Sequence, residues 1–484
     1  MTHRFSSKLF ASLCGVAASS LLFVGVANAA VTQPGDVSNA PAAAAQKEVS
    51  PELQAAFDDF RNMKFEDATA KLDKIRESDK DMAPSQLILA TWLAQITPPQ
   101  PQAVRQAIEV AVTKHPNDPE AYVILAELNL QNSCVTEAEA LFDKGATMNA
   151  SFADSAKRKG EIQKRILIGQ AQILALRGKR DEAIATLNNV LKLDEKNIGA
   201  LNLLGLISFN AEDYDAAINA YTKAREIQPT LLLPQARVAM MCQQKGTDEG
   251  KSLAAKYMKE AIAADAKDPQ VRIVAAQWSL TIGKAAQAAQ QADYAIQILA
   301  QQKTAKPDDA LTTGLYNEAK QLRGVIALFE KDYATAEKQF NEILAESPSN
   351  FAATNNLALA LCEQADEAKQ KKAVEYAQVN VDRFGQQQPE VFSTAAWVMH
   401  KMGKYQECAQ LLQRYIQLTS GNMSSDVAYY LAANMEKLAD NVSDAEQKAN
   451  ILKQAKEIIT KTLENEAPFV MRPEAEALKA RLDK

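Results

Sequence analysis

Residues that commonly build catalytic and metal sites are scarce in this chain. Its 484 residues include three histidines and five cysteines. There is no paired Cys motif, no His-Glu-x-x-His helix and no Gly-x-Ser-x-Gly turn, the patterns typical of zinc sites and serine hydrolases. His3 belongs to an N-terminal apolar segment, and the isolated imidazoles of His115 and His400 make no metal cluster. We therefore predict that the protein is not an enzyme and has neither a metal nor a cofactor.

An excess of positive charge is also lacking, and this argues against nucleic acid as a partner. The formal net charge is −6 at pH 7, and a mildly acidic protein is a poor nonspecific binder of nucleic acid. Gly246–Ser252 ends like a phosphate-binding loop, but three residues separate its glycines where four are required. Asp248 and Glu249 would repel phosphate, so we predict an ordinary turn between helices.

Aromatic residues are few, and alternating β-strand patterns are missing. Aromatic residues make up 6% of the chain and hydrophobic residues 47%, which indicates an aliphatic, Ala-rich core. No sustained Val/Ile/Thr alternation of the kind a sheet needs occurs. Periodic apolar stretches such as 198–209 and 319–328 favour helices instead. The composition predicts an all-α protein.

What the chain does contain is a repeat. Ala183 and Ala217 lie 34 residues apart, each just after a polar turn. Residues 198–231 carry a full set of spaced residues, which are Leu201, Leu204, Gly205, Tyr214, Ala217, Tyr221, Ala224 and Pro229. Residues 317–350 repeat it with Gly324, Tyr333, Ala336, Phe340 and Pro348. A period of this size predicts stacked helical hairpins, each too small to be stable alone.

These two segments resemble tetratricopeptide repeats, with a Leu-Gly pair in 198–231, an Ala opening the second helix, an aromatic residue one turn later and a closing Pro. Looser matches in register are 119–150, 164–197, 232–268, 351–388 and 389–422, and weaker candidates are 54–84, 85–118, 269–303 and 424–470. The resemblance implies a right-handed α-solenoid of stacked helix-turn-helix repeats.

The expected organisation follows the repeats and the two chain ends. Basic Arg4 and Lys8, the apolar stretch 9–26 and Ala27-Asn28-Ala29 are typical of a secretory signal peptide; an uncleaved membrane anchor is the alternative. The predicted parts are a signal peptide (1–29), a flexible Ala/Pro linker (30–50), N-terminal repeats (51–150), central repeats (151–303), a connector (304–316), C-terminal repeats (317–470) and a capping helix (471–484). We expect an exported protein, periplasmic or extracellular in a bacterium, or anchored to the inner membrane in the alternative.

Cysteine pairing is constrained by the repeat geometry. A disulfide needs Cα atoms closer than about 7 Å, whereas neighbouring helices pack about 8–10 Å apart. Only Cys362 and Cys408 lie in adjacent repeats and leave a bridge open. Cys242 and Cys408 fall at small-residue core positions, so we expect free thiols that pack as small apolar side chains.

The first helices of such repeats line the concave side of the stack, and the register set by Gly205 and Gly324 predicts which residues face inward. The predicted groove consists of Arg165, Gln172, Asn202, Leu206, Asn210, Gln243, Gln277, Gln321, Phe329, Asn355, Trp397 and Lys401. Its amide side chains carry both donors and acceptors, which suits the backbone of an extended peptide. Leu206, Phe329 and Trp397 are candidate anchor pockets.

The sequence therefore predicts a non-enzymatic interaction scaffold of the cell envelope, which binds a peptide segment or partner protein in a concave helical groove. A more specific version makes it part of an envelope assembly or export machine. Nucleic acid is excluded as a partner, and a membrane is reached only through an uncleaved signal segment or a partner. The alternative is an enzyme or small-molecule binder that uses the irregular segments 151–163 or 300–316.

Overall fold

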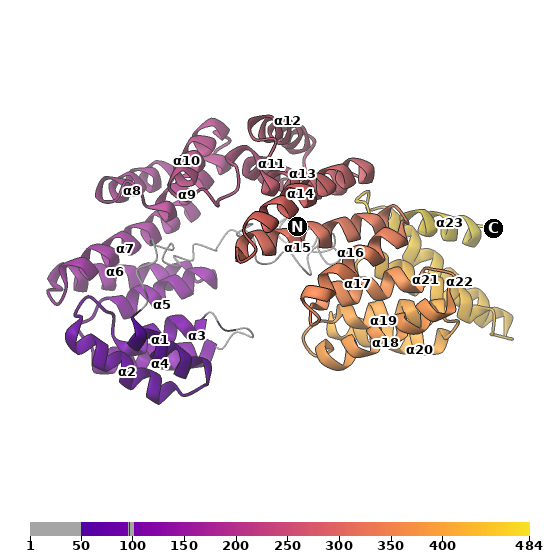
Figure 1. Cartoon of the computed structure of the whole chain (residues 1–484), viewed down its shortest axis with the longest axis horizontal. Helices are drawn as coiled ribbons and strands as arrows, with labels where there is room; N and C mark the ends of the chain where they lie inside the picture. Colours follow the sequence, from indigo (N-terminus) through magenta and orange to yellow (C-terminus); the bar gives the residue numbers. More distant parts are fainter. Residues whose placement is uncertain (1–49, 95, 97–100) are drawn as a thin grey trace, which may run out of the picture. The chain divides into compact units, whose positions relative to one another are not determined.

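The structure, a computed structural model, describes residues 50–94, 96 and 101–484. These residues form 23 α-helices and no strand (Figure 1), which confirms the all-α solenoid expected from the repeat. The predicted signal peptide and all but the last residue of the predicted linker lie outside the described residues.

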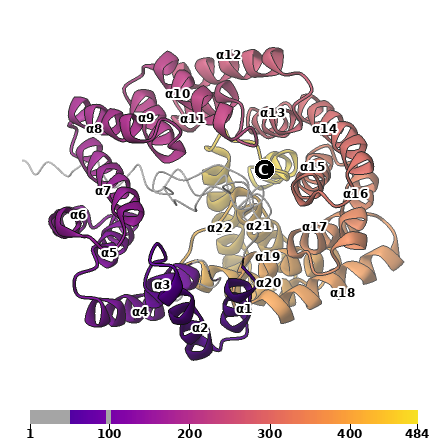
Figure 2. The same ribbon diagram turned by 60° about the vertical axis from the view of Figure 1, so that its left-hand side comes forward.

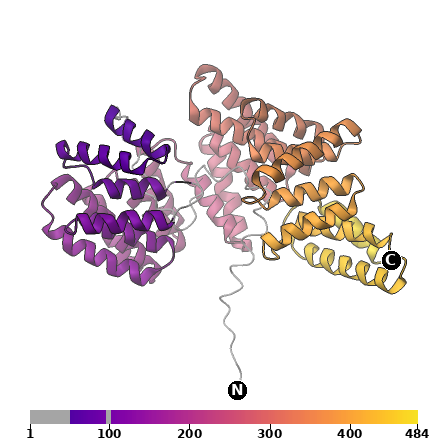
Figure 3. The ribbon, with the colours of Figure 1, turned by 90° about the horizontal axis from the view of Figure 1, so that it is seen from below.

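The chain divides into two compact units between Pro234 and Gln235. We call the described residues 50–234 the N-terminal unit and residues 235–484 the C-terminal unit. The N-terminal unit holds α1 (Pro51–Arg61), α2 (Phe65–Ser78), α3 (Ser85–Ala94), α4 (Pro101–Lys114), α5 (Glu120–Gln131), α6 (Val135–Ser151), α7 (Ala156–Leu176), α8 (Arg180–Leu193), α9 (Ile198–Asn210) and α10 (Tyr214–Ile227). Its helices, coloured indigo to magenta, follow one another as antiparallel rods (Figure 3).

The C-terminal unit begins one residue after the start of α11 (Pro234–Gln244). It continues through α12 (Asp248–Ala264), α13 (Pro269–Thr281), α14 (Ala285–Ala305), α15 (Ala310–Phe329), α16 (Tyr333–Glu346), α17 (Phe351–Cys362), α18 (Glu367–Phe384), α19 (Glu390–Lys401), α20 (Tyr405–Leu418), α21 (Ser425–Ala439), α22 (Ala445–Leu463) and α23 (Arg472–Leu482). Its division from the N-terminal unit falls within the stretch predicted as central repeats, which therefore contributes helices to both units.

Most of the described hairpins turn through a short segment with the same backbone pattern, although the α17–α18 and α21–α22 turns lack it. One residue between the two helices adopts a positive φ, and it is Gly178, Gly283 or Gly403 in three of the turns. Lys331 (φ 58°) and Met63 (φ 61°) take the same place in two others. Glycine is favoured there because a Cβ is strained at positive φ. Side chains such as Asp332, which accepts a hydrogen bond from the Thr335 amide at 3.1 Å, then cap the second helix.

The two helices of a hairpin approach closely where the repeat places glycine. A Cβ built on Gly205 would lie 2.3 Å from Tyr221 Cε1, and one built on Gly324 would lie 2.5 Å from Phe340 Cε1. Tyr221 and Phe340 are buried, so each aromatic ring packs directly on the backbone of the facing helix. This packing explains why the Gly and the aromatic residue recur together in 198–231 and 317–350.

Odd-numbered helices line the inner side within each unit. Some helices contact the helix two places further along the chain. In the N-terminal unit, these pairs are α5 with α7 and α7 with α9. In the C-terminal unit they are α13 with α15, α15 with α17, α17 with α19 and α19 with α21. Figure 2 shows α15 and α17 nearer to the C-terminal helix than α16 and α18. The first helix of each hairpin is therefore the inner one, as the repeat register requires.

The segments expected to be irregular are mostly helical. Residues 151–163 contain the end of α6, a four-residue break and the start of α7, while 300–316 contain the end of α14 and the start of α15. The predicted connector 304–316 lies in the same stretch. The physical reason is that α7, α14 and α15 are 20 or 21 residues long, so helices longer than the repeat norm occupy the extra sequence. Within these two segments, only residues 152–155 and 306–309 lie outside the helices.

Several smaller expectations can be checked in the described part of the chain. Cys134, Cys242, Cys362 and Cys408 are free, and the last three are buried, as expected for small core side chains. Gly246–Ser252 forms a helix–helix turn in which Thr247 Oγ1 accepts from the Gly250 amide at 3.0 Å and caps α12. Among the residues described, no helix is long and apolar enough to cross a membrane, and no group of three potential ligands could hold a metal ion.

Candidate protein-binding surfaces

Every residue of the predicted groove lies on an odd-numbered helix. Arg165 and Gln172 are on α7, Asn202, Leu206 and Asn210 on α9, Gln243 on α11, Gln277 on α13, Gln321 and Phe329 on α15, Asn355 on α17, and Trp397 and Lys401 on α19. The repeat register thus places these residues on the inner helices. The two units differ, however, in whether this face is open.

In the N-terminal unit, the inner stripe of α7 and α9 is partly open to solvent. Gln172, Asn202 and Leu206 are half-buried, and Asn210 at the end of α9 is exposed. The stripe combines amides with one aliphatic side chain, so it offers hydrogen-bonding groups beside an apolar contact. This stripe is one part of the predicted groove that is accessible to solvent.

Arg165 belongs to a charged network inside the N-terminal unit. Its guanidinium forms ion pairs at 2.7 Å with Glu120 and at 2.7 Å with Glu127, both on α5. Burial lowers the pKa of Arg165, but the attraction of Glu127 and Glu120 outweighs burial and raises the pKa above its ordinary value. Arg158, two turns earlier on α7, pairs with Asp118 at 2.8 Å and Glu120 at 2.7 Å. Arg165 therefore joins α5 to α7, and its charge is already neutralised by these carboxylates.

Two predicted groove amides of the C-terminal unit bond to side chains on the next inner helix. Gln243 accepts a hydrogen bond from Trp278 Nε1 at 3.1 Å, joining α11 to α13. The Gln277 amide lies 3.5 Å from Glu318 Oε1, joining α13 to α15, and burial raises the pKa of Glu318 to about 7. Gln321 is half-buried, and its Oε1 has no hydrogen-bond partner. Gln243 and Gln277 therefore have hydrogen-bond partners, whereas the Gln321 side-chain oxygen is buried without one.

Further along the C-terminal unit, the predicted groove residues are covered. Asn355 is 5% exposed and Trp397 3% exposed. Trp397 donates its Nε1–H to Glu363 at 2.6 Å, and Lys401 forms an ion pair with Glu363 at 3.0 Å. The prediction that Asn355 and Trp397 are open to solvent is wrong, because both are buried in the helical packing, where the Trp397 ring contacts Tyr429 and Tyr430 of α21.

Residues 464–471, which join α22 to α23, also lie against the inner helices of this unit; we call them the C-terminal segment. Phe469 and Met471 are buried in the same hydrophobic core as α15, α17, α19 and α21. Lys331 Nζ donates to the Val470 carbonyl at 2.9 Å, and the Met471 amide donates to Asp426 Oδ1 at 2.9 Å. Charged side chains from two distant hairpins thus hold the backbone of one short segment.

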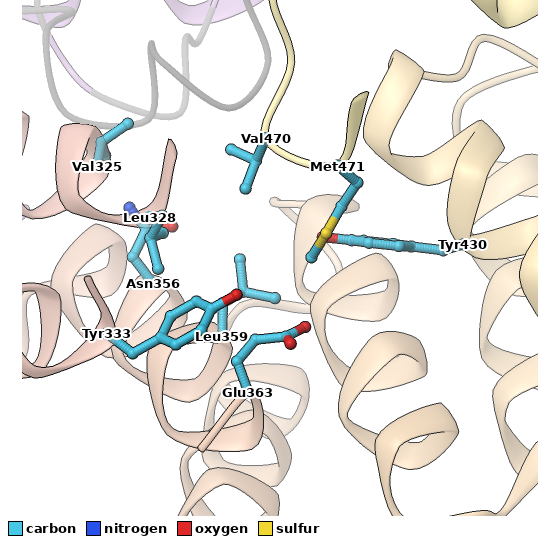
Figure 4. A pocket seen from close by; sticks show the side chains of 9 residues that line it. All are labelled: Val325, Leu328, Tyr333, Asn356, Leu359, Glu363, Tyr430, Val470 and Met471. Carbon is cyan, nitrogen blue, oxygen red and sulfur yellow. The ribbon is translucent and has the colours of Figure 1, made fainter. Parts of the chain in front are cut away.

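A small cavity remains between the C-terminal segment and the inner helices. It measures about 20 Å³, enough for a single water molecule. Its lining consists of Val325, Leu328, Tyr333, Asn356, Leu359, Glu363, Tyr430, Val470 and Met471. Figure 4 shows Val470 and Met471 reaching down from the segment, and the Tyr333 hydroxyl and Glu363 carboxylate on the opposite side.

Aromatic side chains form the wall beside this cavity. The Trp397 ring stacks on Tyr430 at 4.4 Å and on His400 at 4.7 Å between centroids. His400 Nδ1 lies 3.1 Å from Asn434 Oδ1. Burial lowers the pKa of His400, and the contact with Asn434 offsets part of that. These rings act as packing between α19 and α21, and His400 has no metal or nucleophile beside it among the described residues.

Sequence reasoning missed Lys331, Asp426 and the C-terminal segment. Lys331 lies in a turn and Asp426 lies at the start of a helix. Charged residues are common in both places, so the sequence did not indicate that either one makes a long-range contact. The apolar run Phe469-Val470-Met471 is the one available sign, because it interrupts an otherwise polar stretch between 464 and 484. A solvent-exposed linker would not need three consecutive large apolar residues, so the run indicates a buried segment.

Comparisons with known proteins agree with the repeat geometry. The family model of the tetratricopeptide repeat matches residues 168–231, which contain the C-terminal part of α7 and all of α8, α9 and α10. No curated protein matches the chain.

Several solved structures are similar in fold. A tetratricopeptide repeat protein from Parabacteroides merdae is 14% identical, covering 66% of this chain and 99% of that one at a TM-score of 0.35. Yeast Tom70 is 14% identical, covering 89% and 96% at a TM-score of 0.34. PilF of Pseudomonas aeruginosa is 19% identical, covering 46% and 93% at a TM-score of 0.33. Identities and scores this low support no inference about function. The family match identifies tetratricopeptide repeats within residues 168–231, and helical hairpins continue on both sides of that stretch.

Proposed function

We propose that the protein is a non-enzymatic scaffold of the cell envelope that binds a peptide segment or partner protein on the inner stripe of α7 and α9. A more specific form of the proposal makes it one component of an envelope assembly or export machine. Tetratricopeptide repeat proteins generally bind protein partners, and this supports the protein-binding part.

One observation carries the proposal. Gln172, Asn202 and Leu206 lie within the residues that match the family, and all three are half-buried while the residues beside them, such as Ala171 and Leu203, are buried. The stripe is therefore solvent-accessible surface on a rigid helical support. An extended peptide could exchange backbone hydrogen bonds with the amides and place an apolar side chain against Leu206.

Export and location are proposed from the N-terminal sequence alone. Basic residues, an apolar stretch and Ala27-Asn28-Ala29 support cleavage after a secretory signal, and an uncleaved segment would instead anchor the protein to the inner membrane. N-terminal sequencing of protein purified from its native cell distinguishes the two. A mature chain that still starts at Met1 would contradict cleavage.

The protein-binding part is tested by affinity capture from native envelope with the full-length chain. We expect a stoichiometric protein partner that is lost when Gln172→Arg and Leu206→Arg are introduced together. Asn219→Arg on α10 is the matched control, because Asn219 is exposed on the second helix of the same hairpin as Leu206, and it should retain the partner. A tightly bound small molecule with no protein partner would overturn the proposal.

A further inference from the structure

Equivalent positions of the repeat are accessible in one inner helix and covered in another. Aligning Gly205 with Ala358 through the Leu-Gly and Leu-Ala pairs matches Leu206 to Leu359. Leu206 is half-buried, whereas Leu359 is 6% exposed. All eleven residues from Ala352 to Cys362 on α17 are buried, although a helix on the inner side of a repeat stack ordinarily leaves one stripe to solvent. Something therefore occupies the place of a ligand over α17.

The occupant is the C-terminal segment. Val470 and Met471 face Leu359 across the small cavity (Figure 4), and Phe469 and Met471 are 7% and 4% exposed. Pro468 Cγ lies 3.6 Å from the position a Cβ would take on Gly283, in the turn between α13 and α14. The segment thus crosses the inner face from α21 to the α13–α14 turn.

The inner face contacts the backbone of this segment as well as its buried side chains. Lys331 donates to the Val470 carbonyl, and Asp426 accepts from the Met471 amide. These two contacts do not depend on the side chains at 470 and 471, so another extended chain could make them. Side-chain selectivity comes from the apolar sites of Phe469 and Met471 and from Glu474, which pairs with Lys331 at 2.9 Å.

The fit of the segment is incomplete, which distinguishes it from a well-packed cap. The cavity beneath Val470 and Met471 is unfilled by protein atoms. Arg472 Nε and Glu474 Oε2 are buried without hydrogen-bond partners, and the Asp426 carboxyl is buried beneath the segment. Buried polar atoms without partners and unfilled space both weaken attachment, so these features reduce the free energy that holds the segment down.

We propose that the C-terminal segment is a displaceable internal ligand, and that the inner face of α15, α17, α19 and α21 binds an extended peptide of a partner protein with the same chemistry. That chemistry is a run of large apolar side chains followed, three residues later, by an acidic one, as in Phe469-Val470-Met471 and Glu474. The proposal does not rest on the stripe of α7 and α9, which lies in the other unit.

The experiment measures binding of a fluorescent synthetic peptide, residues 465–484, to the full-length protein. The wild-type chain should bind it weakly, because its own segment occupies the site. Phe469→Ser with Met471→Ser in the full chain should release that segment and raise the affinity for the peptide at least tenfold. Adding Lys331→Gly and Asp426→Ala should abolish the gain, because these substitutions remove the donor to the Val470 carbonyl and the acceptor of the Met471 amide.

Met63→Gly is the matched control for Lys331→Gly, because Met63 holds the same positive-φ place in the α1–α2 turn; added to the released chain, it should leave the gain intact. A peptide with the same composition in scrambled order should not bind. A released chain that keeps its helical circular dichroism but binds the peptide no better than the wild type would overturn the proposal. Concentration-dependent dimers of the wild-type chain, formed by exchange of the segment, would also overturn it in favour of a second copy as the occupant.

Hydrogen exchange of the wild-type chain gives a second test that needs no variant. The amide of Met471 should exchange at least tenfold faster than the core amides of α21, because displacement of the segment opens this site without unfolding the helices. Equal protection of Met471 and α21 would show a permanent cap and contradict the proposal.

Discussion

Helices α9 and α17 occupy the same place in their hairpins, and yet one presents a partly open inner face and the other does not. Both begin with an Asn cap, Asn197 and Asn350, whose side chains accept at 2.9 Å from the amides of Ala200 and Ala353. The difference arises from residues more than a hundred positions later in the chain. The repeat fixes where an inner helix lies, whereas an added segment determines whether its surface is available.

The two units also differ in how their cores are organised. In the N-terminal unit, buried residues group into successive local clusters along the chain. In the C-terminal unit, one cluster extends from Ile273 to Leu478. Because the C-terminal segment touches several hairpins at once, it links repeats that would otherwise contact only their neighbours.

The largest expected effect separates the two units. Phe340→Ala and Phe142→Ala each remove a fully buried ring and should each cost about 3–5 kcal/mol of unfolding free energy. We expect Phe340→Ala to lower the stability of the C-terminal unit alone and Phe142→Ala that of the N-terminal unit alone, measured by urea unfolding followed with hydrogen exchange. If either change unfolds both units in a single transition, the two units are not independently stable.

The next effect concerns the matched inner positions. Leu359→Ala should cost about 2–4 kcal/mol, because it opens a cavity beneath the C-terminal segment. Leu206→Ala should cost about 1 kcal/mol, because part of the side chain already contacts water. Urea unfolding of the two full-length variants gives both values. Equal losses would mean that Leu206 is as thoroughly covered as Leu359.

A smaller effect depends on pH. Burial raises the pKa of Asp426 to about 6, although hydrogen bonds from the Met471 and Val470 amides lower it in part. The charged and titratable groups around it are Lys331, Glu474 and Tyr430. When the C-terminal segment lifts away, the carboxyl meets water and its pKa returns toward the ordinary value of 3.8. The attached state therefore binds the proton more tightly.

Attachment should accordingly be strongest below pH about 4, weaken as the pH rises to about 6, and then stay level. The protection factor of the Met471 amide should fall on the order of tenfold between pH 4.5 and pH 7. Asp426→Asn should remove this dependence. A protection factor that rises with pH in the wild type would show that the carboxylate, not the carboxylic acid, favours attachment.

The smallest expected change in stability comes from substituting glycine in two hairpin turns. Met63→Gly should stabilise the N-terminal unit by about 1 kcal/mol, because glycine relieves the strain of a positive φ. Lys331→Gly should gain the same relief but lose the contacts to Val470 and Glu474, so its net effect should be near zero. The change in melting temperature is measured for each variant, and the difference between the two changes gives the contribution of Lys331 to holding the segment. Identical shifts would show that it contributes nothing.

Sequence alone predicted much of the fold, because its signal is local. Gly205, Tyr221, Gly324 and Phe340 fall at spacings that only close helix packing explains. The predicted repeats match the helical hairpins from α1–α2 to α21–α22. The same register placed every predicted groove residue on an inner helix, from Arg165 to Lys401.

The accessibility of those residues could not be predicted in the same way. Asn355 and Trp397 were predicted to lie in the groove because nothing near them in the sequence indicates that they are buried. Contacts such as Lys331 with Val470 join residues far apart in the chain and follow no period, so they emerge only from the folded structure. Arg165 was likewise placed correctly but is tied to Glu120 and Glu127 across α5 and α7. Whether any of these residues binds a partner stays a prediction.

Hydroxyl-radical footprinting of the full-length protein measures the accessibility of both inner faces in one experiment. We expect Leu206 to be oxidised several times faster than Leu359, and Phe469→Ser with Met471→Ser to bring Leu359 to a similar rate while Leu206 is unchanged. Equal oxidation of the two leucines in the wild-type chain would contradict the claim that one inner face is open and the other is covered by the protein's own C-terminal segment.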